Sequence, residues 1–230
     1  MRFRHHDEIW RDFPGLVPGV IHVEGVTAAA DVSTAAARFT DVARSRLTRA
    51  PESELAEIQA WRRAFTRMGL RPTQYRCAAE SLLRRLRTHG RLPGLHPLVD
   101  LCNAVSVAFA IPVAALDVSA IAGDLQVRYA AGDEEYLTFS GETEHPAAGE
   151  VIFRDDAGKA HARRWTNRQS GLSAVRDSTT TALIVAEALH ESAAADIARL
   201  TAAIASELDA IWSVKAAPAI LTATTPHVDF

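Results

Sequence analysis

The sequence predicts an α+β fold, with helices flanking a mixed, mostly antiparallel sheet, and two features of its patterning carry that prediction. Apolar residues recur at helical spacing in several segments before residue 110 and again near the C-terminus. Between these regions, short runs of strand-forming residues alternate with turn signals, as in a β-meander. Neither an internal repeat nor a long linker divides the 230 residues, so we expect a single domain over residues 1–230.

The first expected elements are a strand and two helices. A β-branched run over residues 17–23 follows a proline–glycine turn and predicts a strand. Asp31 or Ser33 can cap a helix over residues 35–47, where apolar positions repeat every 3.6 residues. A second helix is expected over residues 51–68, because acidic side chains fill its first turn and a glycine follows its last.

Two more helices are expected before the strands begin. One opens at Arg71 and ends at Gly90, and the other spans residues 98–109 after a His-Pro pair. The chain has two cysteines, Cys77 and Cys102, and both fall within these apolar patterns. The sequence therefore predicts neither a disulfide scaffold nor a cysteine zinc site, and it favours a cytosolic, cytoplasmic protein.

The remaining sequence predicts strands followed by a last helix. The strand-like runs cover residues 125–129, 136–139, 151–153 and 160–165. Another apolar run covers residues 182–189, and helical spacing returns over residues 193–212. The tail over residues 216–230 is expected to trail over the surface.

Composition and charge exclude several classes of protein. Hydrophobic residues make up 48% and charged residues 23%, as in soluble globular proteins. No run approaches the roughly 20 uncharged apolar residues of a membrane span, and the N-terminus lacks the apolar segment of a secretory signal. The net charge of −3 argues against tracking along DNA, because that activity requires a basic surface, although a local basic patch remains compatible with it.

The motifs of several common chemistries are missing. There is no glycine-rich phosphate loop, no Gly-x-Ser-x-Gly elbow and no His-Glu-x-x-His helix. The nine histidines are scattered without metal-ligand spacing, and His5-His6 falls in an end that we expect to fray. The sequence therefore predicts no cofactor and no metal.

The helix over residues 98–109 combines an apolar composition with three polar side chains. Asp100, Asn103 and Ser106 recur every three residues and so share one narrow face. Buried polar groups need partners, so these side chains either bond the helix to a neighbouring loop or line a polar cleft that receives a ligand.

Arginines gather in three segments. They are Arg62, Arg63, Arg67, Arg71 and Arg76, then Arg84, Arg85, Arg87 and Arg91, then Arg163, Arg164 and Arg168. They form either solvated helix faces or a basic patch for RNA phosphates, and many of the acids lie elsewhere, around residues 133–150. The last segment also holds Trp165 among polar side chains, which either stacks on a base, ribose or amino acid or covers the edge of a sheet.

Several motifs in order resemble a known family. They are Val-Asp-Leu-Cys-Asn over residues 99–103, Ile-Pro-Val-Ala-Ala-Leu-Asp over 111–117, Gly-Asp-Leu-Gln-Val-Arg over 123–128 and Gly-Glu-Val-Ile-Phe over 149–153. Together they resemble the B3/B4 domain of the phenylalanyl-tRNA synthetase β subunit, with the strongest match over residues 70–190. The sequence contains no synthetase catalytic region, so the chain is similar to a free-standing B3/B4 protein.

The resemblance implies an activity and a site. In the synthetase this domain is the editing site, which hydrolyses the ester between a wrong amino acid, tyrosine, and the 3′ end of the tRNA. Asn103 matches the helix asparagine of that site and Glu187 the glutamate that recognises the amino acid. Three positions differ: Ala114 replaces a histidine, Cys102 replaces a threonine, and the bulky segment 163–170 replaces a glycine-rich loop. The resemblance therefore implies a deacylase whose amino acid differs from tyrosine.

From these observations we assign expected roles. The amides of Asn103 and Gln169 would orient the water or the carbonyl, and Glu187 would contact the amino group or side chain. The remaining expected contacts with the substrate come from Trp165, Asn167, Arg164, Arg168 and Ser106. The expected contacts with RNA come from Arg71, Arg76, Arg84 and Arg85.

Three functions remain open from the sequence. The first is a trans-editing aminoacyl-tRNA deacylase that acts on a mischarged tRNA without a metal. The second is a binding module without catalysis, which would hold tRNA, an amino-acid-like ligand or a partner protein. The third is a metabolic hydrolase that acts on free amino-acid esters.

Overall fold

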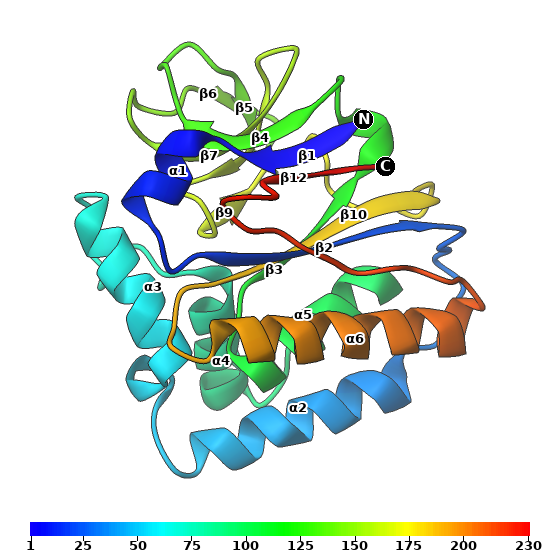
Figure 1. The fold of residues 1–230 in the computed structure, drawn as a ribbon. Coiled ribbons are helices and arrows are strands. Elements are labelled where there is room, and N and C mark those ends of the chain that lie inside the picture. Colours follow the sequence, from blue (N-terminus) through cyan, green and yellow to red (C-terminus); the bar gives the residue numbers. More distant parts are fainter.

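Two stacked β-sheets with helices packed under one of them make up the computed structural model, which describes residues 1–230 (Figure 1). Sheet A has six strands in the order β12-β1-β4-β7-β8-β9, and sheet B has four in the order β11-β2-β10-β3. In sheet A, β1 and β4 pair in parallel. All other neighbouring strands of sheets A and B are antiparallel. The predicted α+β class with a mixed, mostly antiparallel sheet is confirmed.

The elements have the following bounds. The helices are α1 Asp7–Asp12, α2 Ser33–Leu47, α3 Ala56–Arg67, α4 Ala78–His89, α5 Pro97–Phe109 and α6 Ala193–Trp212. The strands of sheet A are β1 Arg2–His5, β4 Leu125–Tyr129, β7 Val151–Asp155, β8 Ala160–Arg163, β9 Arg168–Gln169 and β12 His227–Asp229. Those of sheet B are β2 Val17–Glu24, β3 Val113–Asp117, β10 Thr181–Ala188 and β11 Ala219–Ile220, and β5 Tyr136–Leu137 pairs with β6 Thr143–Glu144.

Residue alternation along β10 divides the core into two layers. Leu183 and Val185 belong to the cluster that also holds residues of sheet A, whereas Ile184 and Ala186 belong to the cluster packed against α5 and α6. Successive side chains of a strand point to opposite faces, so the odd-numbered residues of β10 face sheet A. Figure 1 shows α5 and α6 beneath sheet B and α2 beneath them.

The ends of the chain differ from what the sequence predicts. The N-terminal segment is β1, buried at the level of Phe3 and His5, and it lies between β4 and β12. The tail contributes β11 to sheet B and β12 to sheet A. The predictions of a frayed start and a trailing tail are therefore wrong, because both ends pair with strands that lie far away in the sequence.

Most helices match their predicted ranges, and two of them begin several residues later than predicted. The expected helix over residues 51–68 begins with a short 3-10 turn, and α3 itself begins at Ala56. The helix expected from Arg71 begins at Ala78 and ends as predicted at Gly90, whose φ of 73° is the left-handed conformation of a helix C-cap. No helix in the structure has the length and apolar composition needed to cross a membrane.

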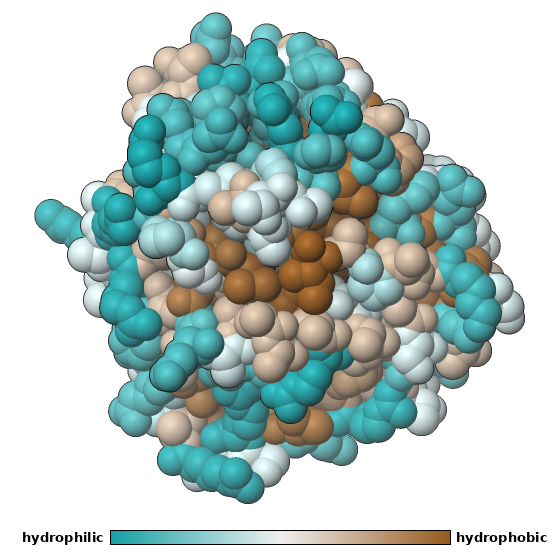
Figure 2. All heavy atoms as spheres, viewed as in Figure 1, coloured by the Kyte–Doolittle hydropathy of each residue, from teal (hydrophilic) through white to brown (hydrophobic).

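The hydropathy of the surface differs between the region of sheet A and the level where the two sheets meet. Figure 2 shows hydrophilic residues over the part that Figure 1 draws as sheet A, and strongly apolar residues gathered in the middle, at the height of β2. The apolar group lies at the level where the two sheets meet. The space between the sheets therefore contains the larger apolar cluster and, at one end of it, a hollow.

Candidate functional site

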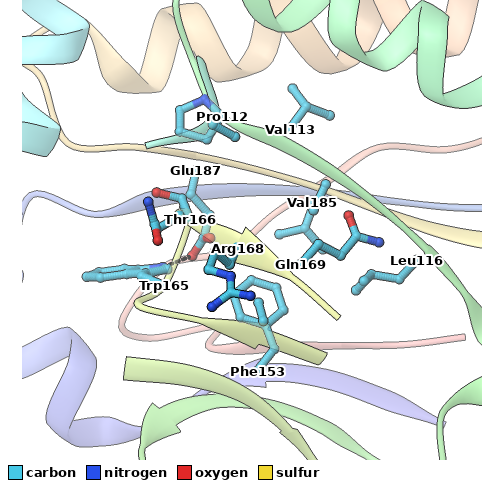
Figure 3. Close-up of a pocket in the computed structure, with 14 residues that line it drawn as sticks. Pro112, Val113, Leu116, Phe153, Trp165, Thr166, Arg168, Gln169, Val185 and Glu187 are labelled. Atoms are coloured by element: carbon cyan, nitrogen blue, oxygen red, sulfur yellow. Dashed lines mark hydrogen bonds between the residues drawn. The ribbon is translucent and has the colours of Figure 1, made fainter. Parts of the chain in front are cut away.

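A small hollow of about 70 Å³ lies between the two sheets, beside the turn that joins β8 to β9. Its lining consists of Ala78, Pro112, Val113, Ala114, Leu116, Phe153, Ala162, Trp165, Thr166, Asn167, Arg168, Gln169, Val185 and Glu187. Figure 3 shows Trp165 and Glu187 at one side, Gln169 and Leu116 at the other, and Phe153 below them. Four of the predicted substrate residues and one predicted catalytic residue, Gln169, therefore line one cavity.

Trp165 forms a fixed wall of this hollow. Arg164 and Trp165 have φ values of 46° and 58°, so two consecutive residues adopt the left-handed conformation and turn the indole inward. The indole is 1% exposed and packs edge-on against Trp61 and Phe13, with ring centroids 5.0 and 4.8 Å away. Of the two roles left open for Trp165, covering a sheet edge is excluded, because the side chain lies in the core and lines the hollow.

Glu187 is the buried acid of the hollow. One carboxylate oxygen, Oε1, accepts a hydrogen bond from Trp165 Nε1 at 2.9 Å and lies 2.6 Å from His5 Nε2. The Glu187 side chain has no further hydrogen bond in the chain, so Oε2 is unbonded although the residue is 2% exposed. Since an indole N–H can only donate, Oε1 is occupied by its two neighbours and Oε2 is left for a ligand.

The geometry also indicates the tautomer of His5. Its Nδ1 is buried and has no partner, whereas Nε2 faces Glu187 Oε1. A buried N–H without an acceptor is costly, so the arrangement favours a proton on Nε2 and none on Nδ1. His5 Nε2 therefore donates the hydrogen bond to Glu187 Oε1.

Two amides and a hydroxyl line the side of the hollow. Asn167 Nδ2 donates to Arg76 O at 2.7 Å, and Gln169 Nε2 donates to Ala115 O at 2.8 Å. These bonds fix both side chains and leave Oδ1 and Oε1 as acceptors. The Thr166 hydroxyl is buried without a partner. Together these three side chains offer acceptors and a donor for a water or a polar ligand.

The arginines around the hollow are largely neutralised by nearby acids. Arg163 pairs with Glu150 at 2.9 Å and with Glu144 at 2.5 Å, while Arg168 lies 3.3 Å from Glu144. Burial opposes ionisation of Glu150, but the bonds from Arg163 outweigh it and hold the pKa of Glu150 below its usual value. Glu144 and Glu150, from the acidic segment 133–150, therefore pair with these arginines in the folded protein.

Arg164 lies outside the hollow. Its N–H donates to Glu150 Oε1 at 2.9 Å and its guanidinium lies 4.6 Å from the ring centroid of Tyr75. Because Tyr75 lies three residues before Ala78, the first residue of α4, and Ala78 N donates to Thr166 O at 2.8 Å, the start of α4 is tied to the wall of the cavity. Arg76 and its neighbours consequently lie near the cavity.

The structure does not bring Asn103 or Ser106 to the hollow. Both belong to α5, whose core residues pack in the layer between sheet B and the helices, on the other side of sheet B. Ser106 is fully buried and donates to Ile111 O at 2.7 Å, and Asp100 Oδ1 accepts from Leu95 N at 2.9 Å. Asp100 and Ser106 therefore follow the first of the two alternatives, in which polar side chains bond the helix to neighbouring loops.

The predicted RNA-binding arginines divide into two kinds. Arg71, Arg84 and Arg85 are exposed and make no ion pair, so their charges are available to a partner. Arg76 is half-buried and lies 3.6 Å from Glu80 Oε1, which also binds Arg62. The basic surface around α4 is therefore narrower than the sequence suggests.

One further cluster has the composition of a metal site. Ligand atoms of Glu57, His190 and Asp196 lie within 4.8 Å of one another. However, Arg46 binds Glu57 at 2.7 Å, and Ser192, His190 and Arg199 all bond to Asp196. Because the carboxylates are already matched by cations and donors, the cluster consists of two separately paired acids: Glu57 joins α3 to α2 through Arg46, and Asp196 is bonded around the start of α6.

Two residues of the site, His5 and Thr166, are not expected from the sequence. His5 falls in the end that we expect to fray, although alternation in Arg-Phe-Arg-His is the period of a half-buried strand and is a usable signal. Thr166 has no comparable signal, because its position in the hollow depends on the left-handed turn at Arg164 and Trp165.

A family model described as the B3/4 domain matches residues 60–211. The chain belongs to the B3/4 domain family. The match spans α3 to α6 and so includes every residue that lines the hollow. Within this B3/4 domain, Ala114, which stands where the resemblance has a histidine, places a methyl group in the cavity wall.

Two proteins show how the B3/4 domain relates to longer chains. The phenylalanine–tRNA ligase β subunit of Shewanella oneidensis is 33% identical over 73 residues, which are 32% of this chain and 9% of that protein. A crystal structure of an N-terminal fragment of the phenylalanyl-tRNA synthetase β subunit from Pyrococcus horikoshii aligns with a TM-score of 0.45 and 7% identity, over 93% of this chain and 49% of that one. The chain thus spans a small part of the first relative and about half of the second.

Proposed function

We propose that this B3/4 protein binds the 3′ end of a mischarged tRNA and hydrolyses the ester that joins the amino acid to the terminal ribose. The observation that carries the proposal is Glu187, a buried carboxylate with one oxygen unbonded at the end of a hollow. A buried anion is suited to a cationic partner, and the α-ammonium group of an aminoacyl ester is such a partner. Membership of the B3/4 family supports the same reading.

The amides supply the positioning that ester hydrolysis needs. Gln169 Oε1 and Asn167 Oδ1 can accept hydrogen bonds from a water, because the nitrogens of both side chains are already bonded to carbonyl oxygens. The Thr166 hydroxyl and the Arg168 guanidinium supply donors for the oxygen that becomes negative during the reaction. The aminoacyl ester is already activated, so positioning and charge stabilisation are sufficient.

The proposed step balances without a further reactant. The water oxygen bonds to the ester carbonyl carbon, and the bond between that carbon and the ribose oxygen breaks. The ribose oxygen takes a proton that the water gives up. The free amino acid leaves with the water oxygen in its carboxyl group. The products are the uncharged tRNA and the amino acid.

RNA contacts would come from the surface beside the hollow. Arg71, Arg84 and Arg85 are exposed without ion pairs, and α4 begins at the cavity wall. Arginines that neutralise phosphates release counterions, so affinity for tRNA should fall as salt rises.

A binding module without catalysis is the second candidate function. The observation that favours it is Ala114, whose methyl group occupies the wall where the resembling family has a histidine. Such a module would hold aminoacyl-tRNA in the same hollow and release it intact.

Deacylation of a panel of mischarged tRNAs separates the candidates. The experiment compares the wild-type protein with Glu187→Gln and with Glu191→Gln, an exposed control that removes the same charge four residues away. We expect wild type and the control to release amino acid faster than spontaneous hydrolysis and Glu187→Gln to be slower by roughly 10- to 100-fold. Saturable tRNA binding with no release from any member of the panel would establish the binding module instead.

A further inference from the structure

The cavity itself limits which aminoacyl group can enter it, and we infer that the site accepts small side chains and excludes aromatic ones. This inference rests on the proposed function, since it names the substrate class of the same hollow. It depends on three features of the structure: the volume of the cavity, the rigidity of its wall and the position of the buried acid.

The volume is the first feature. The hollow measures about 70 Å³, whereas an apolar cavity that binds benzene measures roughly 150 Å³. A phenyl or phenol ring is therefore too large to lie wholly inside the hollow. Side chains of the size of those of alanine or serine fit within it.

The rigidity of the wall is the second feature. Enlarging the hollow on its inner side would require Trp165 to move, and its indole is held by Trp61, Phe13 and the hydrogen bond to Glu187. Trp61 is itself fixed by a bond from Nε1 to Glu187 O at 3.2 Å. Because close-packed interiors resist small displacements, the indole acts as a steric stop.

The placement of charge is the third feature. Glu187 and Trp165 lie on the same side of the hollow, and apolar side chains such as Ala114, Ala162 and Val185 form other parts of the wall. A ligand whose ammonium group reaches Glu187 Oε2 must therefore place its side chain in the small remaining apolar space. An aromatic aminoacyl group cannot satisfy both contacts at once.

The binding test uses amide analogues that cannot be hydrolysed: adenosine carrying alanine or phenylalanine through a 3′ amide. We expect the alanyl analogue to bind about 10-fold or more tightly than the phenylalanyl analogue, because overpacking costs ~1–3 kcal/mol. Equal or tighter binding of the phenylalanyl analogue, or no binding of either, overturns the inference. Since no bond is broken, this result is independent of whether the protein is a hydrolase.

A cavity-filling variant provides the second measurement. Ala114→Leu adds carbons to empty space rather than removing them from a packed core, so the protein should still fold. We expect it to weaken binding of the alanyl analogue by roughly 10-fold or more, while Ala198→Leu on the exposed face of α6 leaves binding unchanged. Undiminished binding by folded Ala114→Leu would show that the aminoacyl group does not enter this hollow.

The deacylation series completes the test with a single tRNA bearing glycine, alanine, serine, phenylalanine or tyrosine. Preferential hydrolysis of the three small esters supports the inference, and hydrolysis of the aromatic esters at equal rates refutes it. If the alanyl analogue binds selectively and none of the esters is hydrolysed, the size limit stands and the proposed deacylase fails. The two ideas are thereby tested separately.

Discussion

His5 Nε2 lies 2.6 Å from Glu187 Oε1, although the two residues are 182 positions apart in the sequence. The contact joins β1 of sheet A to β10 of sheet B, and both side chains are almost fully buried. The acid of the proposed site is thus held by the same contact that helps fix the stacking of the two sheets. Changes at either residue should affect stability as well as binding.

The energetic coupling of this pair can be measured with a double-mutant cycle. We expect His5→Ala and Glu187→Gln to show a coupling energy within the ~0.5–3 kcal/mol found for contacting groups, towards its upper part because the pair is buried. The exposed pair Arg2 and Asp229, which are 2.7 Å apart, should couple by less than about 1 kcal/mol. Urea unfolding measures both cycles, and a coupling no larger for the buried pair than for the exposed one would contradict the structural role assigned here.

Close packing of β2 on α6 predicts the effect of a single methyl group. A Cβ at Gly19 would lie 2.6 Å from Thr201 Cγ2 and 2.7 Å from Ile197 Cγ2. We expect Gly19→Ala to lower the free energy of unfolding by ~1–3 kcal/mol through overpacking. Gly94→Ala is the control, since nothing lies within 4 Å of its added Cβ. Equal thermal midpoints for the two variants would mean that α6 does not pack on β2 as described.

Both cysteines are expected to be inert in the folded protein. Burial raises the pKa of the Cys77 thiol and of the Cys102 thiol to about 12 in each case. Because the thiolate is the reactive form, a thiol reagent should modify neither residue in the native protein and both after denaturation. Rapid labelling of either thiol under native conditions would show that its helix is not packed in the core.

The hydrogen bonds around Asp196, at the start of α6, predict how stability depends on acid. Burial opposes ionisation of Asp196, but the bonds from Ser192, His190 and Arg199 outweigh it and lower the pKa of Asp196 to about 2. A depressed pKa stabilises the fold above the unfolded value and loses that contribution as pH falls through the folded value. The contribution of Asp196 should therefore disappear between about pH 4 and pH 2.

The contribution of Asp196 is measured as the free energy of unfolding at a series of pH values for the wild-type protein, for Asp196→Asn and for the exposed control Asp133→Asn. We expect Asp196→Asn to be the less stable variant at neutral pH and to differ least from wild type near pH 2. If both variants showed the same dependence of stability on pH, the hydrogen bonds to Asp196 would not stabilise the fold as described.

Local periodicity was sufficient for most elements of the fold. The last helix has its predicted bounds in α6, and the helix expected over residues 98–109 differs from α5 by one residue at its start. These segments carry their signal within themselves, as spacing, caps and breakers. The apolar run over residues 182–189 was not assigned, because a fully buried strand such as β10 lacks the alternation of a half-buried one.

Local patterns predicted the site only where sequence neighbours stay neighbours, whereas Glu187 of β10 was expected from the family resemblance and does line the hollow. Trp165, Asn167, Arg168 and Gln169 come from one turn, and they reach the hollow together. Asn103 was expected there as well, but helical spacing shows which residues share a face without showing which layer the face meets. His5 illustrates the converse, since only the pairing of β1 with β4 brings it beside Glu187.

The central claim, that the hollow beside Glu187 receives the aminoacyl end of tRNA, is tested most directly by NMR of the indole N–H groups. The chain has four tryptophans, and Trp165 donates to Glu187 inside the hollow whereas Trp212 donates to Thr27 O at 3.1 Å near the surface. Titration with the alanyl amide analogue of adenosine should shift the Trp165 signal, assigned with Trp165→Phe, and leave the Trp212 signal in place. An unchanged Trp165 signal at saturating analogue would contradict the claim.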